Sequence, residues 1–234
     1  SADVLYNSQE NASYWYDQRC AQPVATAPDG RGVYDCGGAP EAIVVGSFNG
    51  GESTLFALSA SKDWDTDYGR FDLFASYTHA DVKDIGYGTS STATSNYSDF
   101  AAYDRQSPSE GISNFQVENM FKLRFNWRNE LIPGYQTRVS LFATRRSGQP
   151  YSYTFSENNN CVLDVGGGRC ARESRNDDAG HLLYVPSGIN DPLFSPASFG
   201  GDLAAQQAFF DYIDNSELSQ YKGGIAPRNG DNSP

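Results

Sequence analysis

The chain is poor in the side chains that most often build catalytic centres. It has two histidines, His79 and His181, among 234 residues. His79 falls at the end of a predicted strand and His181 in a long loop. No Gly-x-Ser-x-Gly elbow is present, and VGGGR (165–169) is not followed by the Gly-Lys-Ser/Thr of a phosphate loop. These absences predict a protein that is not an enzyme and has no bound cofactor.

Basic residues are also few for the length of the chain. Lys and Arg number 17 against 29 Asp and Glu, which gives a formal net charge of −12. Binding to a nucleic-acid backbone needs clustered Lys and Arg, so the composition argues against a nucleic-acid partner. An acidic surface is ordinary for loops that face the outside of a cell and must stay soluble.

One acidic segment offers the ligands that calcium prefers. Asp177 and Asp178 lie in NDDAG (176–180), and their carboxylates supply hard oxygen atoms. The segment lacks the regular ligand spacing of a calcium-binding loop. We therefore expect a solvated turn and no resident metal, with calcium at these two residues as the alternative.

Long apolar runs are absent. No stretch of about 18 apolar residues occurs, so the sequence predicts no transmembrane helix. Strands of a membrane barrel alternate apolar and polar side chains and leave no such run. Residues 1–20 lack the basic and apolar regions of a signal peptide, so we expect a mature chain or a piece of one.

The four cysteines fall into two close pairs. Cys20 and Cys36 form one and Cys161 and Cys170 the other, and neither pair has metal-finger spacing. Both lie in polar stretches rich in Gly, Asn and Asp, where a covalent link can replace a core. We predict a disulfide within each pair and hence an oxidising compartment.

The strongest pattern is alternation between apolar and polar residues. In NFQVENMFKLRFNW (114–127) the odd positions are almost all apolar and the even positions are mostly polar or charged. Similar alternation and turn-forming connectors predict five antiparallel strands. Their expected ranges are 53–64, 70–79, 114–128, 135–148 and 150–155.

Two all-β architectures fit this alternation. A soluble sandwich packs one face on a core and exposes the other. A partial transmembrane β-barrel is favoured by strands of about 12 to 14 residues, longer than the usual 5–6. It is also favoured by aromatic residues at the strand ends and by short connections at one end with long ones at the other.

In the barrel interpretation the two faces of the strands meet different media. The odd-numbered face is lipid-facing, and the even-numbered face is lumen-facing and wet. The predicted lipid-facing residues are Phe121, Leu123, Phe125 and Leu141. The predicted lumen-facing residues are Glu118, Lys122, Arg124 and Arg138.

The strands are predicted to lie between two loop regions. Residues 1–51 form an irregular extracellular loop region that holds the first disulfide, and 52–155 hold the strands. Residues 156–234 form a long extracellular loop with the second disulfide. A short helix within this last region is expected to begin at an Asp202 cap, in GDLAAQQAFFDYIDNS.

Several segments resemble a known family. SSTATSNYSDFAAYDRQSP, SNFQVENMFKLRFNW, RSGQPYSYTF, LLYVPSGINDP and YKGGIAPRNGDNSP are similar to TonB-dependent outer-membrane receptors, above all the Oar-like group. The likeness covers about residues 52–234. It implies a barrel of about 22 strands around an N-terminal plug, which imports scarce substrates with energy passed on by TonB.

The resemblance also implies partners and a location. Plug, TonB box and closing strand are not found here, so we expect an interior piece of the barrel. Its partners would be outer-membrane lipid, the rest of the barrel and plug, and the TonB complex, at the cell outer membrane or cell surface. The alternative is a secreted or surface structural β-protein that forms homo-oligomers through open strand edges, as a filament or layer.

Overall fold

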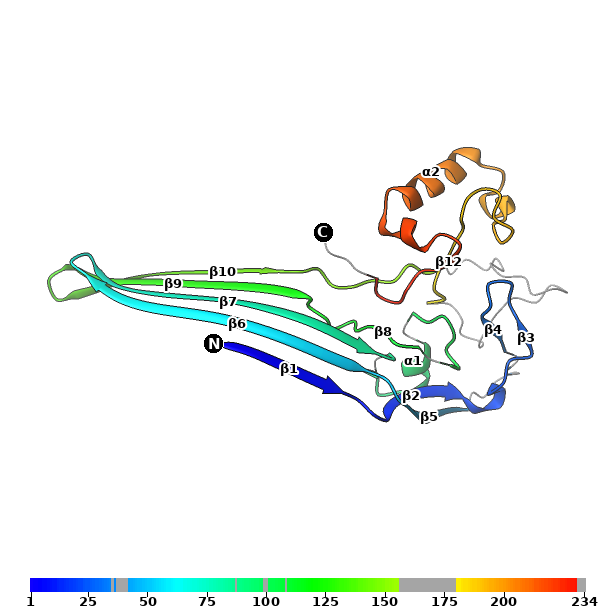
Figure 1. Cartoon of the computed structure of the whole chain (residues 1–234), viewed down its shortest axis with the longest axis horizontal. Coiled ribbons are helices and arrows are strands. Elements are labelled where there is room, and N and C mark those ends of the chain that lie inside the picture. Colours follow the sequence, from blue (N-terminus) through cyan, green and yellow to red (C-terminus); the bar gives the residue numbers. More distant parts are fainter. Residues whose placement is uncertain are drawn as a thin grey trace.

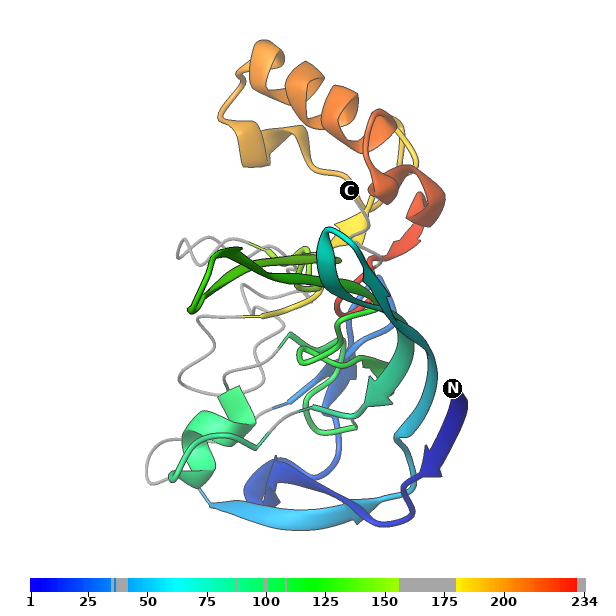
Figure 2. The same cartoon turned by 90° about the vertical axis from the view of Figure 1, so that its left-hand side faces the viewer.

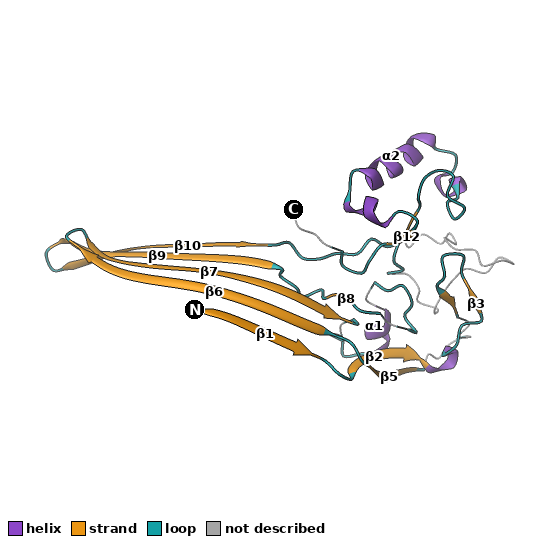
Figure 3. Cartoon of the chain, viewed as in Figure 1, coloured by secondary structure: helices purple, strands orange, loops and turns teal. Residues whose placement is uncertain are grey.

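The computed structural model describes residues 1–34, 36, 42–86, 88–98, 101–107, 109–155 and 180–230. Antiparallel β-sheet is the main regular structure of these residues, which confirms the predicted β-class, and their main sheet is open. The helices gather at the end opposite two hairpin tips (Figures 1 and 3). No helix of the described residues is long and apolar enough to cross a membrane.

Five long strands build the main sheet. They are β1 (Ala2–Ser8), β6 (Glu52–Thr66), β7 (Gly69–Asp84), β9 (Asn119–Ile132) and β10 (Tyr135–Arg146). Their order is β1-β6-β7-β9-β10, every neighbouring pair is antiparallel, and the two-residue β8 (Gly111–Ile112) pairs with the end of β7. Seen from the hairpin end, the sheet curves as an arc that does not close (Figure 2).

The two hairpins are tighter than the sequence pattern predicts. Glycine makes both turns possible, because Gly69 has φ +112° and Gly134 has φ +83°. The strands therefore continue through the predicted connectors, and β9 runs to Ile132 before β10 begins at Tyr135. The predicted hairpin of 114–146 is confirmed over its paired residues.

The predicted start of this hairpin at residue 114 is wrong. Gln116 N–H donates to the Ser113 carbonyl at 3.0 Å, which makes a turn, and the Gln116 side-chain oxygen accepts from Val82 N–H at 2.6 Å. A side chain thus occupies the place where a continuing strand would pair. Alternation alone does not distinguish this arrangement from a strand.

Two further expectations are corrected by the pairing. Residues 2–8 were expected to be irregular, but they form β1, which pairs with the edge of β6. Residues 150–155 form no strand, since only isolated bridges occur there, Tyr151 to Gly230 and Thr154 to Leu182. Pro150 breaks the alternation, and the chain turns into the loops.

The loops and short elements beyond the strand ends form one region, which we call the loop body. Its elements are β2 (Ala12–Asp17), β3 (Ala25–Thr26), β4 (Gly32–Val33), β5 (Ile43–Phe48), α1 (Ala93–Ser98), β11 (Tyr184–Val185), α2 (Leu203–Asp214) and β12 (Gly224–Ile225), with 3-10 turns at Gln18–Cys20, Pro196–Phe199 and Glu217–Tyr221. The predicted Asp202 cap is confirmed, because its carboxylate accepts from the N–H groups of Ala204 and Ala205. A small core joins Val185, Ile213, Leu218 and Ala226.

The two hairpin glycines give a matched test of how closely the tips pack. A Cβ atom on Gly69 would lie 2.3 Å from the Arg128 carbonyl oxygen, whereas one on Gly134 meets nothing within 4 Å. At either position an alanine disfavours the positive φ that the turn requires, which costs about 1–2 kcal/mol of stability. Gly69→Ala must also displace the neighbouring backbone, so its loss in free energy of unfolding should exceed that of Gly134→Ala in chemical denaturation. Equal losses would contradict the close contact.

Candidate functional site

One face of the main sheet is mainly apolar, with Lys62 and Arg145 as charged exceptions in its rows, and we call it the apolar face. The register keeps alternate side chains in phase from strand to strand. Its cross-strand rows are Trp64–Phe71–Trp127–Val139, Lys62–Leu73–Phe125–Leu141, Ala60–Ala75–Leu123–Ala143 and Leu58–Tyr77–Phe121–Arg145. The four residues predicted to face lipid therefore share this face.

The apolar face is uncovered. Several of its large side chains are exposed, from 37% for Tyr77 to 72% for Val4, with Phe121 at 42% and Leu141 at 57%. The others are half-buried between their neighbours: Trp64, Phe71, Leu73, Leu123, Phe125 and Trp127. Contiguous apolar patches of this extent are rare on monomeric soluble proteins and mark contact with a membrane or another protein. Such a face indicates contact with a medium or partner other than water.

The apolar face has distinct ends. At the hairpin end Trp64 stacks on Phe71 at 5.4 Å between ring centres, and Trp127 donates its indole N–H to the Tyr68 carbonyl at 2.7 Å. At the loop end the Tyr77 hydroxyl donates to the Asn119 side-chain oxygen at 2.6 Å, with His79 3.1 Å from the same oxygen. Aromatic and polar groups thus bound an apolar band on both sides.

The opposite face is polar, and we call it the polar face. Asp72 accepts from the Asn126 amide at 2.6 Å and lies 3.4 Å from the Arg124 guanidinium, which also sits over the Phe74 ring. Lys122 and Arg138 lie on the same face, as their register with Ser76 and Arg128 shows. Three of the four residues predicted to line a lumen are brought together here.

Glu118 is the exception among those four. It lies one residue before β9, and its carbonyl oxygen accepts from the Ala80 N–H at 2.8 Å. The predicted strand included Glu118, but the turn at 113–116 makes the observed strand start later. Because Glu118 lies outside β9, the alternation of the strand does not determine the direction of its carboxylate.

Both edges of the main sheet are open among the described residues. Beyond β1 and beyond β10 no described strand pairs, so each edge presents unpaired N–H and C=O groups. β10 is 12 residues long and almost wholly exposed, and all seven residues of β1 are exposed. The sheet therefore has two places where a further strand can add.

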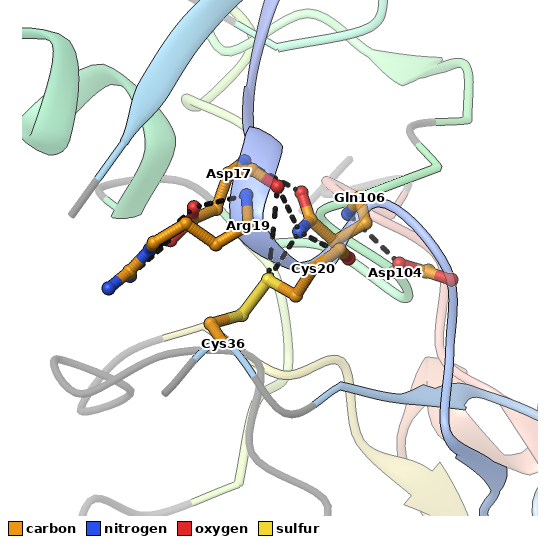
Figure 4. Close-up of a disulfide and its surroundings, with 6 residues drawn as sticks. All are labelled: Asp17, Arg19, Cys20, Cys36, Asp104 and Gln106. Carbon is orange, nitrogen blue, oxygen red and sulfur yellow. Dashed lines mark hydrogen bonds and ion pairs between the residues drawn. A yellow bond between two sulfur atoms is a disulfide. The ribbon is translucent and has the colours of Figure 1, made fainter. Parts of the chain in front are cut away.

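The disulfide lies in a polar cluster of the loop body (Figure 4). Cys20 and Cys36 are bonded, as predicted, with their Cα atoms 4.7 Å apart. The Gln106 amide joins this turn to a distant loop, since it donates to the carbonyls of Asp17 and Cys20 at 3.1 and 3.0 Å and accepts from the Asp17 N–H at 2.9 Å. The disulfide is thus part of a clamp between segments about 90 residues apart.

Asp17, Cys20 and Cys36 lie close enough together to suggest a metal site. The two sulfur atoms are bonded to each other, so neither is a thiolate that could bind an ion. The Asp17 carboxylate is paired with Arg19, whose Nε lies 2.9 Å away, and these hydrogen bonds lower the pKa of Asp17. The group is a structural cluster. The predicted Cys161–Cys170 bond and the calcium candidates Asp177 and Asp178 lie outside the described residues.

Arg228 and Asn229 attach the last described segment to the main sheet. Arg228 pairs with the Asp84 carboxylate at 2.7 Å and donates to the Gly111 carbonyl at 3.1 Å, at the end where β7 pairs with β8. The Asn229 amide donates to the Ile112 carbonyl at 2.7 Å. Beside them lies a cavity of about 520 Å³, also lined by Leu182 and Tyr221. Sequence alone predicted no role for Arg228 and Asn229, although both lie in the PRNG segment (227–230).

Asp191 organises the loop within LLYVPSGINDP. Its carboxylate accepts from the N–H groups of Ser187 and Leu193 at 2.7 and 2.9 Å and from the Tyr184 hydroxyl at 3.1 Å. Burial alone would raise the pKa of Asp191, but these donors together lower it. One of the segments that resemble the family is therefore a turn stabilised by a single carboxylate. The sequence pattern did not predict this role of Asp191.

His181 lies at the centre of the loop body. Residues 180–183 hydrogen-bond to residue 102 on one side and to residues 153 and 155 on the other. Burial, together with the nearby charges of Arg105 and Arg31, lowers the pKa of His181 to about 3. The imidazole is neutral at physiological pH, which suits a structural role better than acid–base chemistry.

This pKa predicts a pH-dependent stability. Between about pH 6.5 and 3 the unfolded chain binds a proton at residue 181 and the folded chain does not, so stability is lost as the pH falls through this window. The loss is at most about 1.4 kcal/mol per pH unit. Amide hydrogen exchange at Ala102 and Leu182, corrected for intrinsic rates, should show this decline, and His181→Gln should flatten it. The same slope in both proteins would contradict the assignment.

Comparisons with protein-family models, curated proteins and solved structures gave no match to this chain. Its function must therefore be inferred from the arrangement of its own residues. The relevant features are the two chemically distinct faces of the main sheet, its two edges that are open among the described residues, and the loop body at one end.

Proposed function

We propose that this chain forms part of the wall of a TonB-dependent outer-membrane receptor, a barrel that takes up a substrate across the membrane. The observation that carries the proposal is the uncovered apolar face of a long, curved antiparallel sheet. In this role the apolar face meets lipid and the polar face lines a wet interior. The resemblance of residues 52–234 to this family supports the same role.

The soluble sandwich is less consistent with these features. In a sandwich the apolar inner face packs on a second sheet about 10 Å away. No second sheet of the described residues covers the apolar face, because the remaining sheets have two strands each and lie in the loop body (Figure 1). The apolar face would then stay in contact with water.

The dimensions of the apolar band suit a bilayer. On β6 the band runs from Phe56 to Trp64, and a tilted transmembrane strand needs about 9–11 residues. Aromatic side chains such as Trp64, Trp127 and Tyr135 gather near the hairpin end. Such rings favour the boundary between hydrocarbon and water.

The ends of the sheet suggest an orientation. Outer-membrane barrels have short turns on the periplasmic side and long loops outside the cell. The hairpin tips would then face the periplasm, and the loop body the exterior. A disulfide such as Cys20–Cys36 persists in an oxidising environment, which agrees with this placement.

The polar face supplies no chemistry of its own in this proposal. Lys122, Arg124 and Arg138 would lie along the barrel wall, in contact with water, the plug or a passing substrate. The plug and the coupling to TonB would come from other parts of the receptor. The loop body would meet the substrate first.

The open edges favour one alternative from a different class. A secreted structural protein could assemble through β1 and β10 into a filament or layer, with the apolar faces of neighbouring copies packed together. Fractionation separates the two: a barrel wall is recovered in outer membranes and needs detergent to dissolve, whereas an assembly sediments from water without lipid.

A charge placed on each face tests the proposal. Leu123 lies between Ala75 and Ala143 at the middle of the apolar face, and Lys122 next to it points to the polar face. Leu123→Arg should cost about 2–4 kcal/mol of stability in lipid if it lies near the bilayer midplane. Lys122→Glu is the matched control and should be mild. The measurement is unfolding of membrane-inserted protein, and equal effects of the two would exclude a lipid-facing role.

A further inference from the structure

The polar face of the β9–β10 hairpin is basic, although the chain as a whole is acidic. The formal net charge of the chain is −12, yet β10 has no acidic residue and β9 has one, Glu130. The basic side chains that the register places on the polar face of these two strands are Lys122, Arg124, Arg128, Arg138 and Arg146. Positive charge is therefore concentrated on two adjacent strands.

Three arginines lie side by side near the hairpin tips, and we call them the arginine row. The register pairs Arg70 of β7 with Arg128 of β9, and Arg128 with Arg138 of β10. Residues directly opposite each other on antiparallel strands have Cβ atoms about 4.5–5.5 Å apart, and like charges in such positions are destabilising. The arginine row thus carries an electrostatic cost that a bound anion would remove.

The acidic side chains of β6 and β7 do not neutralise the whole row. Asp65 lies opposite Arg70, and its carboxylate is 4.0 Å from the Arg70 Nε in a pair that is exposed and therefore weak. Asp72 lies opposite Asp63, and its carboxylate is 3.4 Å from the Arg124 guanidinium. These contacts involve one member of the row, Arg70, and one arginine outside it.

Arg128 and Arg138 have no comparable partner. Glu130 is the acidic residue of β9, and its carboxylate accepts from the Gly134 N–H within the turn. Among the residues that the structure describes, no ion pair involves Arg128 or Arg138. Arg138 is exposed and Arg128 is half-buried. Two adjacent guanidinium groups on the polar face are thus available to a ligand.

We propose that the arginine row is a binding site for a solute that carries at least two oxyanion groups, carboxylate or phosphate. The planar guanidinium group binds either group through two parallel hydrogen bonds. Neighbouring strands lie about 4.8 Å apart, so three arginines in a row accommodate two oxyanion groups about one strand spacing apart. Ser140 lies two residues from Arg138 on the same face and offers a hydroxyl donor.

The other basic side chains of the hairpin extend this site along the polar face. Lys122, Arg124 and Arg146 lie beyond the arginine row in the direction of the loop body (Figure 1). A surface with one sign of charge raises the local concentration of the opposite ion and speeds its association. The inference goes beyond the proposed function and does not rest on it, because the polar face contacts water in a barrel wall and in an assembly alike.

Calorimetric titration of the purified chain in a non-ionic detergent tests the inference. The probes are citrate, pyrophosphate, orthophosphate and acetate at low ionic strength. Citrate or pyrophosphate should bind more tightly than orthophosphate and acetate, because each of the first two carries more than one oxyanion group. Tighter binding of citrate identifies carboxylate groups as the ligand chemistry, and tighter binding of pyrophosphate identifies phosphate groups. The affinity should fall as salt is added, since salt screens exposed charges.

Arg138→Gln removes one guanidinium group from the row, and Arg145→Gln is the matched control. Arg145 lies on the same strand but on the apolar face, so both variants lose one positive charge. Arg138→Gln should weaken binding of the preferred probe about 10- to 100-fold, as expected when hydrogen bonds to a charged group are lost, and Arg145→Gln should change it by less than about twofold. Arg138→Lys should have an intermediate effect, because Lys keeps the charge but lacks the planar fork.

Equal weakening by Arg138→Gln and Arg145→Gln would assign the effect to net charge and overturn the inference. The absence of binding by all four probes, in a chain that thermal unfolding shows to be folded, would also overturn it. Binding of polyglutamate without binding of any small anion would assign the row to an acidic protein segment and refute a solute site. Recovery of the chain in outer membranes tests the proposed function separately, so either idea can fail while the other stands.

Discussion

The structure depends on one constraint, the phase of side chains across five paired strands. Successive residues of a strand point to opposite faces, so a slip of one residue in one pair would exchange the faces of every strand beyond it. Here the register is continuous from Phe56 on β6 to Leu141 on β10. The separation of an apolar from a polar face, and each functional proposal built on it, follows from this register.

The loop body meets a different problem, because it has little apolar material to pack. Its central core is small, and buried ion pairs also connect its segments. Arg31 is 1% exposed and pairs with Asp29 at 2.7 Å, with rings of Tyr103 and Phe155 beside it. Buried ions are costly unless paired. Each such pair therefore fixes one arrangement of the loops and disfavours others, as the disulfide does.

The local pattern predicted the part of the fold that has a strong period. Alternation placed Phe121, Leu123 and Phe125 together because a strand's period of two is visible in a single sequence. It missed β1, because Val4, Leu5 and Tyr6 follow one another and show no period of two, and the strand is defined by its pairing with β6. Contacts between distant segments, such as Arg228 with Asp84, leave no local pattern in the sequence. These contacts within the loop body could therefore not be predicted.

The uncovered face and the open edges are linked by the medium around them. In water an unpaired strand edge can bond to solvent, and an apolar face is the costly feature. In lipid the costs are reversed. The apolar face contacts hydrocarbon without penalty, whereas each unpaired backbone N–H or C=O group costs several kcal/mol. If Phe121 and Leu141 face hydrocarbon, the outer edge of β10 beside Leu141 must therefore be paired. Membrane location of the apolar face thus requires that further strands pair with the edges of the sheet.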